Sequence, residues 1–110
     1  MEGDVLVRLV IAEHLRDAGY RVIETATGEE AHATLEMGAD VDLVFADIDL
    51  PGPWQGTQLV DWLRTQFPGI KVILTSCAFH NLVGAGCDGF IAKPYLPTEV
   101  ATYIETLLGD

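Results

Sequence analysis

The sequence predicts a single α/β domain in which helices cover both faces of a parallel sheet, giving three layers. Three observations favour this fold class. The chain has 110 residues, of which 49% are hydrophobic, and this is enough for one two-sided core. Short apolar runs, which suit buried strands, alternate with longer segments of helical periodicity. Strands that alternate with helices form parallel pairs with right-handed crossovers.

The first third of the chain predicts a helix, a strand and a second helix. Residues 5–18 are expected to be helical because their apolar residues recur on one stripe, and Gly19 follows as a natural C-terminal stop. Residues 20–24 are expected to form a strand. A helix over residues 27–37 begins with a capping box, in which a threonine is followed three residues later by a glutamate.

The rest of the chain continues the alternation. Residues 41–46 are a short apolar run bounded by turn residues, which is typical of a buried parallel strand. A helix over residues 57–67 ends at Pro68-Gly69, and the β-branched residues 70–75 predict a central strand. The remaining elements are a short helix over residues 79–85, a strand over 89–92 and a helix over 97–108 that begins at an N1-type proline.

The charge of the chain restricts its partners. Six basic and seventeen acidic residues give a net charge of −11. This charge argues against nucleic acid and anionic membrane surfaces as partners, because both bind through Lys and Arg. No apolar stretch approaches the roughly 20 residues that span a bilayer, and the acidic start does not resemble a secretory signal. We therefore expect a cytoplasmic protein, in which Cys77 and Cys87 are free thiols.

Polar side chains stand at the ends of three predicted strands. Asp47 follows residues 41–46, the hydroxyl pair Thr75 and Ser76 closes the central strand, and Lys93 follows residues 89–92. The carboxyl ends of parallel strands meet at one edge of a sheet, where such folds bind ligands. A carboxylate nucleophile, with a hydroxyl and an ammonium to hold oxygens, suits a phosphoryl group. Further carboxylates could hold a divalent cation that offsets the charge.

These residues carry a resemblance to a known family. The matching segments are LVRLVIAEHLRDAGYRVIE from Leu6, VDLVFADIDLPG from Val41, VILTS from Val72 and DGFIAKPY from Asp88. Over residues 2–108 the chain resembles a bacterial two-component response-regulator receiver domain of the stand-alone, chemotaxis-receiver-like kind, shortened at its N-terminus.

The resemblance implies a flavodoxin-like, doubly wound sheet of strand order 2-1-3-4-5. It also implies that Asp47 accepts a phosphoryl group from a histidine kinase or phosphotransfer protein and that the domain then signals by protein contacts. Ser76 would be the switch hydroxyl, Phe90 the aromatic whose rotamer follows phosphorylation, and Lys93 the phosphate-binding lysine before a cis Pro94. Beyond self-phosphorylation and autodephosphorylation, no enzyme activity is implied, and residues 1–110 form one receiver domain with no output domain.

Mg²⁺ is the cofactor that the resemblance implies, but the N-terminus departs from the family pattern. Family members begin with a strand that ends in two acids, the second of which binds the metal. Here Glu2 takes the place of the first acid, Gly3 that of the ligand, and Asp4 the following position. Glycine has no side chain to coordinate a metal. Glu2 or Asp4 would therefore have to act with Asp47 and the backbone carbonyl of Asp49.

The first strand of the family is thus largely missing. The strands on either side of it must then pair directly, or a second copy must fill the gap in a homodimer, or the sheet keeps open edges. The missing strand and Gly3 favour a second function, a degenerate receiver that acts as a phosphorylation-independent binding module. A third is a haloacid-dehalogenase-like phosphohydrolase, in which Asp47 and Asp49 would be nucleophile and general acid; against it, the chain lacks the later acidic pair and the cap domain.

Overall fold

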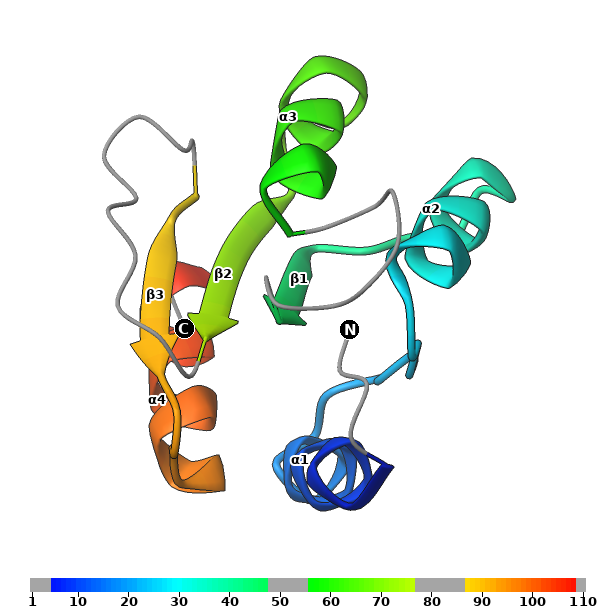
Figure 1. Ribbon diagram of the computed structural model, residues 1–110. Coiled ribbons are helices and arrows are strands. Elements are labelled where there is room, and N and C mark those ends of the chain that lie inside the picture. Colours follow the sequence, from blue (N-terminus) through cyan, green and yellow to red (C-terminus); the bar gives the residue numbers. More distant parts are fainter. Residues whose placement is uncertain (1–4, 48–55, 77–86, 109–110) are drawn as a thin grey trace.

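The computed structural model describes residues 5–47, 56–76 and 87–108 (Figure 1). Within these ranges three parallel strands form one sheet in the order β1-β2-β3. The strands are β1 (Leu43–Asp47), β2 (Lys71–Ser76) and β3 (Gly89–Ala92), and the helices are α1 (Val5–Asp17), α2 (Gly28–Glu36), α3 (Gly56–Gln66) and α4 (Pro97–Leu108). Figure 1 shows α1 and α4 on one side of the sheet and α2 and α3 on the other. The predicted three-layer α/β architecture is therefore confirmed.

The sheet has a separate core on each face because successive side chains of a strand point to opposite sides. Even-numbered side chains, such as Val72 and Leu74, pack with α2 and α3. Odd-numbered side chains, such as Ile73 and Ile91, pack with α1 and α4. Residues 72–76 of β2 are all buried, so this strand is the central one, as its β-branched sequence predicts.

The helix ends follow the signals in the sequence. Gly19 and Gly38 have φ angles of 101° and 90°, a left-handed conformation that favours glycine, and they stop α1 and α2. Thr27 caps the start of α2, where its side-chain oxygen accepts a hydrogen bond from the Glu30 amide at 3.2 Å. None of the helices in the described ranges is long and apolar enough to cross a membrane.

One predicted strand is wrong. Residues 20–24 form no strand, although their sequence suits one. A strand needs a neighbouring ladder to satisfy its backbone, and among the described residues β1 is the edge of the sheet on this side. The Arg16 side chain instead holds this segment, donating to the Val22 carbonyl at 3.1 Å and to the Glu24 carboxylate at 3.0 Å. The helix expected over residues 79–85 lies outside the described residues.

Candidate functional site

The carboxyl ends of β1 and β3 bring a carboxylate and an ammonium together. Asp47 is the last residue of β1, and only 5% of its surface is exposed. Lys93 follows β3, and its Nζ forms an ion pair with Oδ2 of Asp47. The backbone amide of Lys93 also donates to the Ser76 carbonyl at 2.9 Å, which fixes the lysine relative to β2. A buried carboxylate needs such a partner, because an unpaired buried charge is costly.

The end of β2 supplies two hydroxyls, which face opposite ways. Thr75 pairs in register with Asp47 on one side and with Ile91 on the other, so by strand alternation its side chain lies on the same face as Asp47. Ser76 pairs with Ala92 and lies on the other face. Thr75 is fully buried, and its Oγ1 has no hydrogen-bond partner in the part of the chain that the structure describes.

The unsatisfied Thr75 hydroxyl bears on function because buried polar groups are nearly always hydrogen-bonded. It lies on the strand between the two strands whose ends carry Asp47 and Lys93. A group bound at Asp47 could accept a hydrogen bond from it. Both hydroxyls were expected at this edge of the sheet, but the resemblance implies the switch role for Ser76.

Two further residues of the expected site lie beside this centre. The Lys93–Pro94 peptide bond is cis, as the resemblance implies. Phe90 is half-buried in β3 and packs against the core under α2 and α3, in register with Leu74. Its side chain therefore lies on the face opposite to Asp47, and it belongs to the hydrophobic core as well as to the strand that carries Lys93.

Tyr95 lies next to the site, although it was not among the residues expected there. Its ring meets that of Phe45 edge to face, with 5.5 Å between centroids and 87° between planes. This contact ties the segment after Pro94 to β1, two residues before Asp47. The position of an aromatic residue two places after the lysine was the only signal in the sequence.

At the opposite end of the sheet, Asp88 joins three elements. It accepts hydrogen bonds from Arg64 of α3 at 2.5 Å and from the Val72 amide of β2 at 2.8 Å. Burial alone would raise the pKa of Asp88, but the bonds from Val72 and Arg64 outweigh it, and its pKa lies below the ordinary value. Arg64 also donates to the Ile70 carbonyl at 2.9 Å. This cluster fixes how β3 enters the sheet and so supports the position of Lys93.

The described residues do not form a metal site by themselves. No group of three or more His, Cys, Asp or Glu side chains within these ranges could hold a metal ion. Of the ligands that the resemblance implies, Asp47 is described and is paired with Lys93. Glu2, Asp4 and Asp49 lie outside the described residues. Cys87 is a free thiol, while Cys77 is outside these ranges as well.

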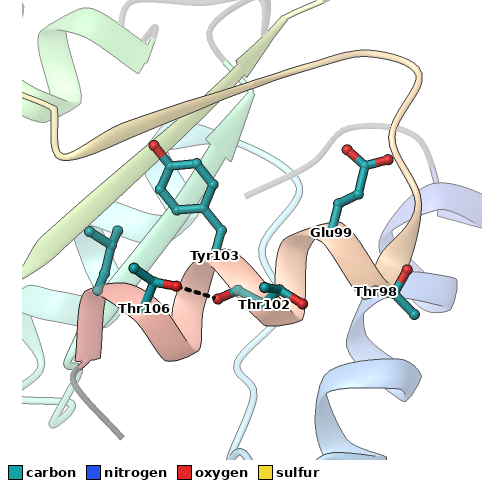
Figure 2. Close-up of a pocket in the computed structure, with 6 residues that line it drawn as sticks. Thr98, Glu99, Thr102, Tyr103 and Thr106 are labelled. Atoms are coloured by element: carbon teal, nitrogen blue, oxygen red, sulfur yellow. Dashed lines mark hydrogen bonds between the residues drawn. The ribbon is translucent and has the colours of Figure 1, made fainter.

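A hollow of about 590 Å³ lies on α4, away from Asp47 and Lys93. It is lined by Thr98, Glu99, Thr102, Tyr103, Thr106 and Leu107. Figure 2 shows the Tyr103 ring standing out from α4, and the Thr106 hydroxyl donating to the Thr102 carbonyl at 3.0 Å. A Cβ atom at Gly89 would overlap the Tyr103 ring, so the glycine allows this ring to lie against β3.

Comparison with known proteins identifies relatives over nearly the whole chain. The model of the response regulator receiver domain matches residues 1–105. The chain is 34% identical over 114 residues to the sensor kinase CckA of Brucella abortus, covering 98% of this chain and 12% of that protein. It is 31% identical to the aerobic respiration control protein ArcA of Escherichia coli, covering 99% of this chain and 47% of that protein. The chain thus spans less than half the length of these relatives.

Solved structures are similar to the chain over the same extent. A CheY-like response regulator receiver domain protein from Methanospirillum hungatei superposes with a TM-score of 0.90, at 27% identity, over 98% of this chain and 89% of that chain. The response regulator TrrA of Thermotoga maritima, in complex with Mg²⁺ and BeF, gives a TM-score of 0.85 at 26% identity, over 96% and 93% of the two chains. These similarities confirm the predicted flavodoxin-like fold class.

Proposed function

The chain belongs to the response regulator receiver domain family, and on that premise we propose that Asp47 accepts a phosphoryl group from a histidine kinase or phosphotransfer protein. The observation that carries the proposal is the ion pair between Lys93 and the buried Asp47 carboxylate. This pair lies at the edge of the sheet where α/β folds bind ligands, which supports a role for Asp47 as nucleophile and for Lys93 as the cation that binds phosphoryl oxygens.

The proposed phosphoryl transfer uses two groups of this chain, the Asp47 carboxylate and the Lys93 ammonium. An oxygen of the Asp47 carboxylate attacks the phosphorus of a phosphohistidine on the donor. The new P–O bond forms as the P–N bond breaks, and the imidazole nitrogen leaves with the electron pair; a proton on the other ring nitrogen of the donor makes the leaving group neutral imidazole. The product is an acyl phosphate on Asp47. The Lys93 ammonium, which pairs with the carboxylate beforehand, then pairs with the phosphoryl oxygens and offsets their charge.

A hydroxyl on the same face of the sheet as Asp47 would join Lys93 in binding the phosphoryl oxygens. We assign this role to Thr75, because it is in register with Asp47 and its buried hydroxyl lacks a partner among the described residues. Ser76, which the resemblance favours, lies on the other face by strand alternation. The hydrogen bond would form only when the phosphoryl group is present, so it would report the phosphorylated state.

Mg²⁺ belongs to the proposal as a cofactor that offsets phosphoryl charge, with Asp47 as its one described ligand. The transfer from phosphohistidine to Asp47 is described without the metal, because the other proposed ligands, Glu2, Asp4 and the Asp49 carbonyl, lie outside the described residues. We propose that the phosphorylated domain acts in the cytoplasm by protein contacts, through surfaces that include α4 and β3.

Incubation with a small phosphodonor and Mg²⁺ tests this function. We expect a phosphoryl adduct that is stable in acid and labile in base, as an acyl phosphate should be. It should be absent from Asp47→Asn and retained in the matched control Asp42→Asn, whose carboxylate is exposed ahead of β1. If partner binding is the same for wild type and Asp47→Asn, with and without donor, the domain is a phosphorylation-independent binding module instead.

A further inference from the structure

The ion pair between Asp47 and Lys93 reaches across a strand. The sheet order is β1-β2-β3, so the strands that carry these two residues are not neighbours, and about 10 Å separates them. Figure 1 shows the ends of the three strands at one edge of the sheet. The lysine spans β2 with a flexible four-carbon stem, which can adopt many rotamers. Its ammonium therefore stays on the carboxylate only if the chain that follows β3 is held in place.

One backbone hydrogen bond anchors the lysine to β2. The Lys93 amide donates to the Ser76 carbonyl at 2.9 Å. The next residue cannot extend this ladder, because Pro94 has no N–H. From here the chain leaves the sheet and reaches the start of α4 at Pro97. A side-chain contact within this short connection would therefore help to fix the orientation of the lysine.

The Tyr95 ring makes such a contact. It meets the Phe45 ring of β1 edge to face, with 5.5 Å between centroids and 87° between planes. Both rings are half-buried and pack against the core under α1 and α4. An edge-to-face pair of this kind is favoured beyond the area that it buries. The contact thus joins the connection after β3 firmly to β1.

The aromatic contact and the ion pair follow one another along β1. Phe45 and Asp47 are two residues apart, so their side chains leave the same face of the strand, about 7 Å apart along it. Lys93, two residues before Tyr95, meets Asp47. Tyr95 meets Phe45, so residues 93–95 run back along the strand. This connection is attached to β1 at two points, one on each side of Pro94.

We propose that Tyr95 is a positioning residue for phosphoryl transfer, which acts through Phe45 to keep the Lys93 ammonium on Asp47. The inference rests on the proposed function of Asp47. An ammonium that already lies where the phosphoryl oxygens arrive needs little reorganisation during the transfer. A displacement of about 1 Å is enough to slow such a step greatly. Tyr95 affects the reaction through Lys93 and not by contact with the phosphoryl group.

The rate of adduct formation with acetyl phosphate and Mg²⁺ tests this role, at a temperature at which circular dichroism shows every variant to be folded. Tyr95→Leu should lower the rate constant about tenfold, because the aromatic contact is lost. Tyr95→Phe keeps the ring and should react at the wild-type rate. The matched control is Tyr20→Leu, which removes another half-buried tyrosine that packs against the same core. It should also react at the wild-type rate.

A double-mutant cycle in thermal unfolding separates positioning from packing and does not require phosphorylation. Lys93→Met should lower Tm, because a buried carboxylate loses the cation with which it forms an ion pair. If Tyr95 holds that cation in place, the fall in Tm caused by Lys93→Met should shrink to about half or less in the Tyr95→Leu protein. A tyrosine that only packs would lower Tm by itself and leave this difference unchanged.

Several results would overturn the inference. They are a wild-type rate for Tyr95→Leu, an equal loss of rate in Tyr20→Leu or Tyr95→Phe, and an unchanged effect of Lys93→Met on Tm. A wild-type protein that forms no adduct would contradict the proposed function of Asp47 instead. In that case the thermal cycle would still decide whether Tyr95 positions Lys93.

Discussion

Thr75 lies directly opposite Asp47 in the pairing of β2 with β1, and its buried hydroxyl lacks a hydrogen-bond partner among the described residues. Such a hydroxyl costs free energy in the resting protein, and under the proposed function it gains a hydrogen-bond partner when Asp47 carries a phosphoryl group. The Thr75 hydroxyl should therefore lower the stability of the fold and raise the rate of phosphorylation, so the two effects can be measured separately.

Thr75→Val keeps the shape of the side chain and removes only the hydroxyl. The free energy of unfolding should stay the same or rise by up to about 1 kcal/mol, because no native hydrogen bond is lost. The rate of phosphorylation from a small donor should fall about tenfold or more, because a donor to the transferred group is removed. Urea unfolding and adduct formation measure the two effects. Ser76→Ala is the matched control, and if it slows phosphorylation while Thr75→Val does not, Ser76 carries the role.

Lys93→Met leaves the buried Asp47 carboxylate without its cation. The free energy of unfolding should fall by about 1–3 kcal/mol, because a buried carboxylate loses the cation with which it forms an ion pair. Asp47→Asn in the Lys93→Met background should restore part of this loss, which a double-mutant cycle by urea unfolding would measure. Additive effects of the two substitutions would show that the pair contributes nothing to stability.

Asp88 should make the stability of the domain depend on acid pH. Its pKa is lower in the folded protein than in the unfolded chain, because the Val72 amide and Arg64 stabilise its charged form against the effect of burial. Its contribution to the free energy of unfolding is therefore fully present above about pH 4, the pKa of an aspartate in the unfolded chain. This contribution is lost as the pH falls through the lower pKa of the folded protein. Wild type should be more stable than Asp88→Asn at pH 7, with a difference that shrinks below pH 4. A difference that stays constant with pH would contradict this.

Gly89→Ala should displace the Tyr103 ring from β3, because the added Cβ would overlap it. We expect a loss of about 1 kcal/mol in the free energy of unfolding, as for other overpacked contacts. The loss should become smaller in a Tyr103→Ala background, where the ring is absent. Gly69→Ala, which meets no atom within 4 Å, is the control. An equal loss in both backgrounds would show that the backbone of β3, and not the ring, requires the glycine.

The sequence was sufficient to predict those elements whose partners are local or strongly patterned. The caps at Thr27 and Gly19 depend on a few neighbouring residues, and the structure has them where they were expected. β2 was recognisable from its β-branched residues because it is buried on both faces. Residues 20–24 have a similar composition but form no strand, because a strand depends on a neighbour that local sequence does not report.

Some features of the site could also be predicted from local sequence, while others depend on residues far apart in the chain. The strand ends were enough to predict that Asp47 and Lys93 lie together, since parallel strands finish at one edge. The choice between Thr75 and Ser76 was beyond the sequence, because it depends on the register of β1 against β2. Asp88 was missed for a related reason: its partners, Arg64 and the Val72 amide, are 24 and 16 residues away along the chain.

Locating the phosphoryl group tests most directly whether Asp47 is the phosphoacceptor. After reaction with a small phosphodonor, borohydride reduces an acyl phosphate on aspartate to homoserine, and peptide mapping by mass spectrometry identifies the position. We expect homoserine at position 47, at a level that Lys93→Met and Thr75→Val reduce. Homoserine at another aspartate, or none at position 47 under conditions that label an established receiver domain, would contradict it.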